Sequence, residues 1–589
     1  MSLQGLYLQA HALANACLTR TQQCRDRWLL QIYNTEKEYY GNHPTAYNQW
    51  LVNRSYFKQS LTEIRSSVKG EFQAVMNHHL DPKNVFSEQN LKECRRFADE
   101  AFIASSKCTS CLVDYARKLC KHSETLTGSP PCKYDVVGLG SMARGEATPY
   151  SDLEFGYIFE RKQADDYFVR LALAMYFTLN NLGETPLKGF YLPEFIDNYG
   201  QEGKEKRWFT DTTTSGFKFD GITPNSGNIP TGNGLPGGRA LMFAVDDLMT
   251  LYRDSLESEN GNKTVGNISY FFASTVCLYS SDGTESLHNS FIRKRSVYEE
   301  GVASVHSLAR QNRLDILLAD ITKYDFLPNF ERGKESETAE VKPDVFRWPT
   351  LLGQNVNINL CMWLSSPWEV FESLRTEGIL TDEKELYFQF ILAAAIVIRN
   401  LAYLTHGTQR DLLSFLTPGV TQTDDRFYVP QPLYINMACM VVPIKKSVLK
   451  SLEQLRREKT GDLLKDMKYV IQRIEIDKND FITKAGVHHF AGDHEGGLQT
   501  LFDALGEKNV KSFQNALTLI RRKYGTNQTD SYEKHCIKVI VSLLCYQHHY
   551  KLALDYYSWF VVDYVRDPSE RWSCQNVMAQ CFTALGDYP

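Results

Sequence analysis

Residues 138–154 read Gly-Leu-Gly-Ser-Met-Ala-Arg-Gly-Glu-Ala-Thr-Pro-Tyr-Ser-Asp-Leu-Glu, and this stretch decides the fold. An apolar run at 134–139, β-branched at its centre, leads into it and predicts a buried strand that ends in a tight turn. A second apolar run at 153–159 predicts the next strand. Because Pro149 disfavours regular helix before that strand, we expect a Gly-Ser turn, a short helical turn and a return between the two strands.

Two acids stand at the head of the second expected strand. Asp152 and Glu154 are separated by Leu153, so the two-residue period of a strand places both carboxylates on one face. Neighbouring carboxylates repel each other unless a cation lies between them, and oxygen ligands favour Mg²⁺ or Mn²⁺. The pair therefore predicts a divalent metal site.

The Gly-Ser turn carries the features of a phosphate site. Gly140 lets the backbone approach a phosphate without a Cβ in the way, and Ser141 offers a hydroxyl and an amide at the expected helix start. A phosphate site and a metal site would then lie one short loop apart. The alternative is a solvated turn followed by an amphipathic strand.

This pattern resembles a known family. Gly140-Ser141, ten residues and then Asp152-Leu153-Glu154 resembles the signature of the DNA polymerase β nucleotidyltransferase superfamily. The fuller pattern, which adds Ala143, Arg144, Glu146, Thr148 and Ser151, resembles the branch that contains the amino-terminal domain of bacterial PII uridylyltransferase. The resemblance implies an enzyme that moves a nucleoside monophosphate from an NTP to a hydroxyl of a protein or small molecule and releases pyrophosphate.

The resemblance also implies residue roles. Asp152 and Glu154 would hold Mg²⁺ or Mn²⁺ in a two-metal site, and Gly140 and Ser141 would hold the outer phosphates of the NTP substrate. Nucleotide-binding roles are expected for two further residues, Ser151 and Arg144. Arg144 would neutralise the leaving pyrophosphate, or would instead form a structural ion pair with Glu146.

Superfamily enzymes generally take a third carboxylate from a later strand. Asp220, which ends an expected strand at 216–220, is our candidate for this catalytic and metal-binding role, and Asp282 is its competitor. The segment Phe272-Ala273-Ser274, in the region that resembles the uridylyltransferase branch, offers no acid. A second hypothesis therefore stays open: a weakly active or inactive nucleotidyltransferase fold that serves as a nucleotide sensor or an interaction scaffold.

Composition excludes some partners. The chain has 589 residues, of which 43% are hydrophobic, and a formal net charge of −5, which gives no general attraction to nucleic acid or anionic membranes. The apolar run 386–398 is too short to span a bilayer and ends at Arg399, so it predicts a core helix. We expect a cytoplasmic protein that binds neither membrane nor polynucleotide.

The chain has fourteen cysteines, which admit a zinc hypothesis. Cys108, Cys111, Cys120 and Cys132 could supply four thiolates, but their spacing is not one of the common zinc patterns. Apolar residues between 91 and 119 recur at helical intervals that include Cys94 and Cys108. Reduced core thiols on a helix are therefore the main expectation.

The expected fold class is α+β: a small mixed-sheet nucleotidyltransferase domain within a mainly helical chain. The expected regions are 1–125, helical; 126–290, the nucleotidyltransferase domain; 291–420, a helical domain on the catalytic cleft; and 421–589, helical-hairpin repeats of the tetratricopeptide (TPR) type, truncated at residue 589. In the second region, residues 164–182 predict a helix, and the Gly-, Pro- and Asn-rich segment 221–239 predicts a lid or a surface loop.

The repeat prediction rests on recurring polar turns. The turns at 547–549 and 585–587 lie 38 residues apart, near the tetratricopeptide period of about 34 residues. Ordinary helical hairpins are the alternative. If the repeats are present, we expect them to bind protein partners. The sequence does not specify the nucleotide base or the acceptor.

Overall fold

The structure is a computed structural model that describes residues 22–39, 45–151, 153–161, 165–182, 242–257, 272–303, 308–324, 339–409, 412–414, 427–458, 463–474 and 568–585, with short pieces between 478 and 554. The expected strand 216–220 and the segment 221–239 lie outside the described residues. The described chain is α+β and mainly helical, as the sequence predicts, with small mixed sheets.

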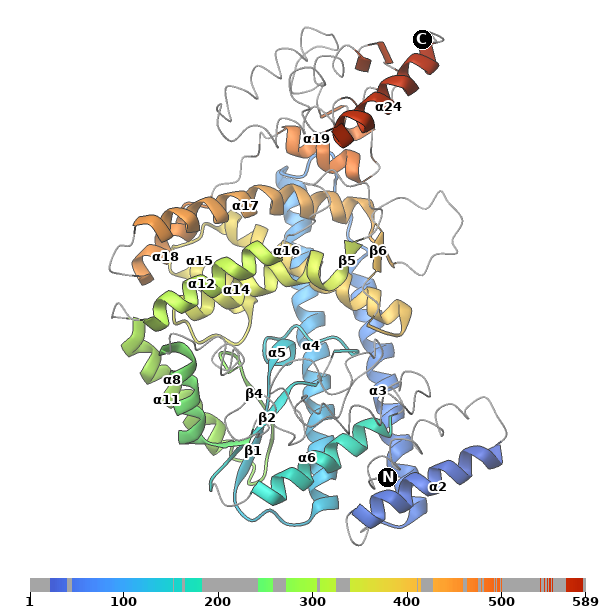
Figure 1. Ribbon diagram of the computed structural model, residues 1–589, viewed down its shortest axis with the longest axis vertical. Helices are drawn as coiled ribbons and strands as arrows, with labels where there is room; N and C mark the ends of the chain where they lie inside the picture. Colours follow the sequence, from blue (N-terminus) through green and yellow to red (C-terminus); the bar gives the residue numbers. More distant parts are fainter. Residues whose placement is uncertain are drawn as a thin grey trace.

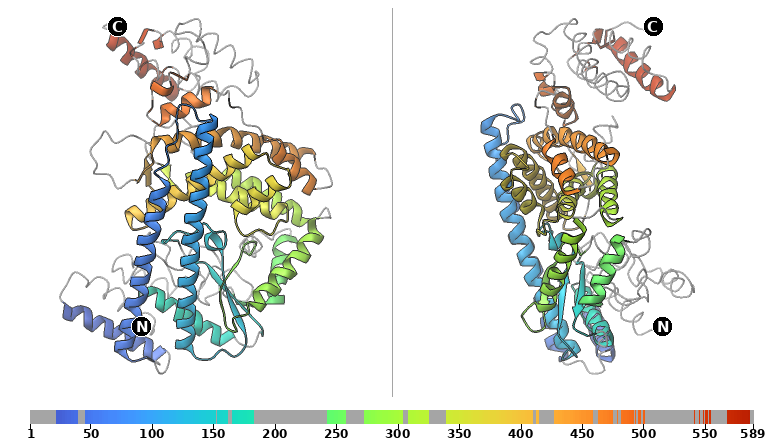
Figure 2. Two further views of the ribbon diagram at one scale, coloured as in Figure 1. Left: turned by 180° about the vertical axis from the view of Figure 1, so that it is seen from behind. Right: turned by 90° about the vertical axis from the view of Figure 1, so that its left-hand side faces the viewer.

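The described part of the N-terminal region contains three helices, α2 (Gln22–Tyr39), α3 (Tyr47–Val75) and α4 (Glu88–Thr127). The Ser87 side chain caps α4 by accepting a hydrogen bond from the Asn90 N–H, and Gly128 follows the helix at φ 91°. Figure 2 shows α4 running from the sheet up to the helices above it, with α3 alongside. This long helix therefore joins the two halves of the molecule.

The cysteines of α4 belong to its buried face. Cys94, Cys108 and Cys120 are buried, whereas Cys111 and Cys132 are partly exposed. Within the described residues, the cysteines of the zinc hypothesis do not form a metal-binding group. The helical spacing of apolar residues therefore accounts for the buried thiols.

A four-stranded sheet lies at the centre of the lower half (Figure 1), in the order β3-β2-β1-β4. Its strands are β1 (Tyr134–Gly138), β2 (Phe155–Phe159), β3 (Met242–Ala244) and β4 (Val276–Ser280). β1 is antiparallel to both β2 and β4, so Gly138 at its end pairs with Phe155 on one side and Val276 on the other. The C-terminal end of β1 and the N-terminal ends of β2 and β4 therefore lie at the same end of the sheet.

Helices cover both faces of this sheet. On one face, α4 and α6 (Asp165–Asn180) share a core with side chains such as Tyr134 and Tyr157. On the other face, α8 (Val245–Glu257) and α11 (Ser286–Ala303) pack with Val137 and Ile158. α6 confirms the helix predicted at 164–182.

A helical layer lies above the sheet (Figure 1). It contains α12 (Leu308–Lys323), a π-helix (Val341–Phe346), α14 (Arg347–Asn359), α15 (Pro367–Thr376), α16 (Asp382–His406), α17 (Gln431–Glu458) and α18 (Leu463–Gln472). Among the helices that the structure describes, α16 is the one long and apolar enough to cross a membrane, but it is almost entirely buried. This burial confirms the core helix predicted at 386–398.

The remaining described elements are short or isolated. A small sheet joins β5 (Ala339–Glu340), β6 (Leu412–Ser414) and β7 (Phe427–Tyr428). Beyond residue 474, the structure describes the helices α19 (Phe481–Phe490) and α24 (Pro568–Leu585). These two helices do not test the tetratricopeptide repeats, which stay a prediction, as do the domain boundaries.

The packing of α14 on α15 leads to a stability prediction. A Cβ at Gly353 would lie 2.5 Å from the Pro367 Cβ, so Gly353→Ala should lower the free energy of unfolding by about 1–3 kcal/mol through overpacking. Gly70→Ala is the control, because no atom lies within 4 Å of a Cβ there and alanine favours the α3 helix by about 0.5–1 kcal/mol. Urea unfolding should separate the two variants, and equal stabilities would contradict this packing.

Candidate functional site

The signature loop leaves β1 and returns to β2 with the predicted geometry. The short helix α5 (Gly140–Ala143) follows β1 after Leu139. The Leu139 N–H donates a 2.9 Å hydrogen bond to the Glu154 carbonyl, and the Glu146 N–H donates to the Ser141 carbonyl at 2.8 Å. The predicted strand, Gly-Ser turn, helical turn and return are confirmed.

Gly140 and Glu154 are in direct contact. Gly140 has φ 61°, a left-handed conformation that L-residues rarely adopt. A Cβ on Gly140 would also lie 1.6 Å from Glu154 Oε2, so the partly exposed Glu154 carboxylate lies directly against the glycine Cα. The acid and the Gly-Ser turn therefore form one site.

Arg144 and Glu146 form a buried ion pair. Arg144 Nε donates to Glu146 Oε2 at 2.9 Å, and the side chains are 8% and 0% exposed. Burial raises the pKa of the Glu146 carboxyl, while the positive charges of Arg144, Arg399 and Arg347 act in the opposite direction. The structure thus places Arg144 in the ion pair that was one of its two expected roles; its contact with a nucleotide stays a prediction.

Ser151 lies in a tight turn around Pro149. Its Oγ accepts a hydrogen bond from the Thr148 N–H at 2.9 Å, and its own N–H donates to the Thr148 carbonyl at 2.9 Å. Arg65 of α3 holds the same turn, donating to the Pro149 carbonyl at 3.0 Å and lying 3.9 Å from the centre of the Tyr150 ring. Ser151 is buried in this turn, and its predicted nucleotide-binding role is not tested.

The helical layer contacts the loop through Arg399 of α16. Arg399 Nη1 lies 3.5 Å from the Glu146 carbonyl oxygen, and Nη2 lies 3.4 Å from Ser151 Oγ. Its guanidinium also lies 4.0 Å from the centre of the Phe346 ring. The sequence analysis did not predict that Arg399 contacts the loop. An arginine within a largely apolar helix was the feature that could have indicated such a buried contact.

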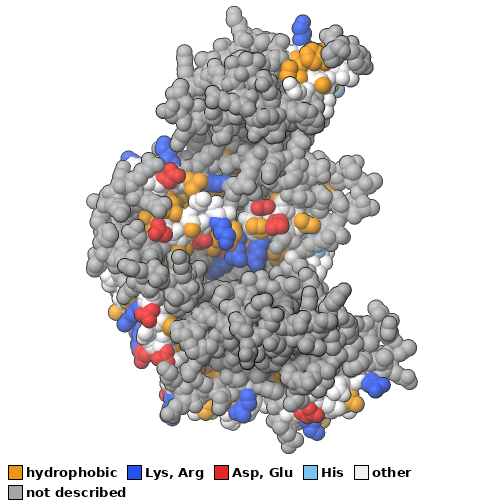
Figure 3. All heavy atoms as spheres, in the orientation of Figure 1, with side chains coloured by type: hydrophobic (Ala, Val, Ile, Leu, Met, Phe, Trp, Pro, Cys, Tyr) orange, Lys and Arg blue, Asp and Glu red, His pale blue; other side chains and the backbone are white. Residues whose placement is uncertain are grey.

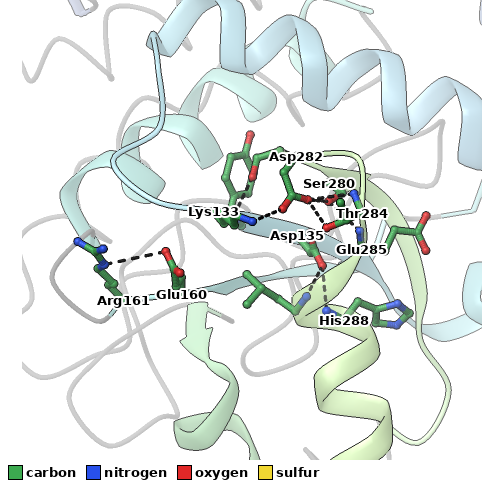
Figure 4. A network of polar contacts seen from close by, with 12 residues as sticks. Lys133, Asp135, Glu160, Arg161, Ser280, Asp282, Thr284, Glu285 and His288 are labelled. Atoms are coloured by element: carbon green, nitrogen blue, oxygen red, sulfur yellow. Dashed lines mark hydrogen bonds and ion pairs between the residues drawn. The ribbon is translucent and has the colours of Figure 1, made fainter.

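Asp152 and Asp220 lie outside the described residues, but Asp282 is described. Asp282 follows β4 and forms a 2.8 Å ion pair with Lys133, which precedes β1 (Figure 4). The five residues of β1 separate this end of the sheet from the opposite end, where Glu154 lies, and the two ends of β1 are roughly 13 Å apart. Asp282 therefore lies at the wrong end of the sheet to be the third acid.

The start of β4 lies at the same end of the sheet as Glu154. Ala273 and Ser274 are buried just before β4, and Arg295 of α11 donates to the carbonyls of Phe272 and Ala273. The segment 272–274, which contains no acidic residue, therefore lies beside the site. Asp220 remains the candidate third acid from the sequence.

Positive charge gathers near this site. Figure 3 shows Lys and Arg side chains in a hollow at mid-height of the molecule, between the lower half and the helical layer. The charges of three arginines, Arg144, Arg347 and Arg399, act on the single Glu146 carboxylate.

One family model matches part of the chain. Residues 95–208 match the family described as "Putative nucleotidyltransferase DUF294". This match begins within α4 and includes β1, the Gly-Ser loop, β2 and α6. The match supports a nucleotidyltransferase assignment for this part of the chain, in agreement with the sequence prediction. It does not test the resemblance to the uridylyltransferase branch. A search of curated proteins gives no match to the chain.

The contact between Gly140 and Glu154 leads to a prediction. Gly140→Ala and Gly145→Ala both place alanine at positive φ, at a cost of about 1–2 kcal/mol each. The nearest atom to a Cβ at Gly145 is 3.8 Å away, whereas at Gly140 the new Cβ would collide with Glu154. The colliding atoms are the far end of a flexible side chain, so Glu154 can rotate away at a cost of about 0.5–1.5 kcal/mol. Gly140→Ala should therefore lose that much more than Gly145→Ala in urea unfolding. If the two variants are equally stable, Glu154 does not lie against Gly140.

Proposed function

We propose that this protein is a metal-dependent nucleotidyltransferase that moves a nucleoside monophosphate from an NTP to a hydroxyl of a protein or small molecule, releasing pyrophosphate. The observation that carries this proposal is the contact between the Glu154 carboxylate and Gly140. An ion bound to that carboxylate lies next to any phosphate held by the Gly-Ser turn. Metal and triphosphate would then share one site.

The residues present fit a divalent ion. Glu154 offers carboxylate oxygens at a partly exposed position, and the lack of a Cβ on Gly140 lets that carboxylate lie against the Gly-Ser turn. In our proposal Asp152 and Glu154 hold Mg²⁺ or Mn²⁺, and Asp220 completes the set. The ions, when bound, would neutralise charge on the triphosphate and on the reacting oxygens.

The chain's own groups would orient the nucleotide. Gly140 at φ 61° directs backbone amides of the turn differently from a regular helix, as in the small anion-binding concavities called nests. Ser141 adds its hydroxyl beside them. The positive charges of Arg144, Arg347 and Arg399, which act on the loop through Glu146, would stabilise the leaving pyrophosphate electrostatically.

One observation favours the second candidate function, a nucleotide sensor or interaction scaffold. Ala273 and Ser274 lie just before β4, beside the site, and neither has a carboxylate that could bind a metal. If Asp220 does not reach the site, the fold would bind a nucleotide without transferring it. Repeats of the tetratricopeptide type in the C-terminal region would then recruit protein partners.

The decisive assay is incubation with each labelled NTP and Mg²⁺ or Mn²⁺, in the presence of cell extract as a source of acceptors. Asp152→Asn and Glu154→Gln should each lower label transfer at least about a hundredfold, the loss typical of removing one group that stabilises transition-state charge. Asp282→Asn is the matched control, because it removes a carboxylate at the opposite end of the sheet. Its transfer rate should stay near that of the wild type.

Two outcomes distinguish the candidate functions. Transfer that is lost in both acid variants and kept in the control supports the enzyme. Nucleotide binding without transfer, for every NTP and both metals, contradicts the enzyme and favours the sensor.

A further inference from the structure

Three side chains of types that can bind a metal gather at the outer strand of the sheet. The ligand atoms of Cys277 on β4, Glu285 in the following turn and His288 on α11 lie within 4.8 Å of one another. Cys277 and His288 are buried, and Glu285 is exposed. None of the three belongs to the proposed nucleotide site.

The local fold brings these residues together. The chain reverses after β4 through Gly283 at φ 70° and Glu285 at φ 53°. Asp135 of β1 then accepts the backbone N–H groups of Leu287 at 3.1 Å and His288 at 2.8 Å, which holds the start of α11 against the sheet (Figure 4). The cluster is therefore held by strand, turn and helix together.

The His288 ring is already oriented. Its Nε2 lies 2.8 Å from Thr275 Oγ1, the kind of contact that fixes the ring of a metal-binding histidine. Burial, with a contribution from Arg295, lowers the pKa of His288 to about 4. Figure 4 shows the Glu285 and His288 side chains projecting to the same side.

The charges around Cys277 favour a cation. The negative charges of Glu285 and Asp135 act on the thiol, and the positive charge of Arg117 acts in the opposite direction. A divalent ion at this position would offset the two carboxylates and stabilise the thiolate.

We propose that Cys277, Glu285 and His288 bind one Zn²⁺ ion, separate from the catalytic metals. A sulfur, a nitrogen and an oxygen ligand suit zinc, whereas Mg²⁺ prefers oxygen ligands alone. The exposed Glu285 opens the site to solvent, which can supply a fourth ligand. The ion would tie the outer strand β4 to α11, just beyond the Ala273-Ser274 segment. The competing explanation is a core thiol beside a structural histidine.

Cobalt reports directly on a thiolate ligand. The full chain, treated with a chelator and titrated with Co²⁺, should show a thiolate-to-cobalt charge-transfer band that Zn²⁺ removes by displacement. Cys277→Ser and His288→Ala should lose one equivalent of bound Co²⁺ and the band that goes with it. Cys111→Ser is the control, because Cys111 is a partly exposed cysteine outside the group, and it should keep both.

The exposed ligand gives a test that does not disturb the core. Glu285→Gln should keep the wild-type circular dichroism and weaken Co²⁺ binding by more than about tenfold, the smallest loss usual even for an outer-sphere partner. Asp282→Asn, in the same turn, should bind Co²⁺ like the wild type. The proposal is overturned if the band is absent from the wild type, survives in a folded Cys277→Ser, or is bound equally tightly in Glu285→Gln.

Discussion

The Glu154 carboxylate lies against the Cα of Gly140, where the Cβ of any other residue would displace it. The hydrogen bond from the Leu139 N–H to the Glu154 carbonyl holds together the end of β1 and the start of β2, next to this contact. The loop between them is then supported from three directions: by its own ion pair of Arg144 with Glu146, by Arg65 of α3 and by Arg399 of α16. Glu154 and the Gly-Ser turn are thereby held together by the protein alone.

This support explains why a small sheet lies within a largely helical protein. A four-stranded sheet with a loop of buried charges needs other elements to exclude water and to balance those charges. The helical layer does both: α16 is almost fully buried, and Arg399 extends from it to Glu146 and Ser151. α4 packs on the sheet and also on α16. The site therefore depends on residues that are far apart in the sequence.

Local pattern was sufficient for β1, β2, the Gly-Ser turn and α6, because periodicity and Pro149 act within a few residues. It predicted α16 as a core helix for the same reason. It could not place Arg399 or Arg65 at the loop, since those contacts depend on how distant helices pack. Nor could it order the strands, so Asp282 remained a candidate acid until β4 proved antiparallel to β1. Cys277 and His288 meet only because a turn and a helix start bring them together.

The most direct measurement of the central claim is a crystal structure with a non-hydrolysable NTP and Mn²⁺, whose anomalous scattering locates the metal. We expect Mn²⁺ on the carboxylates of Glu154 and Asp152, with the outer phosphates on the backbone of Gly140 and Ser141. Nucleotide and Mn²⁺ bound away from Glu154, or a Glu154 carboxylate that has moved off Gly140 without binding the metal, would contradict the account.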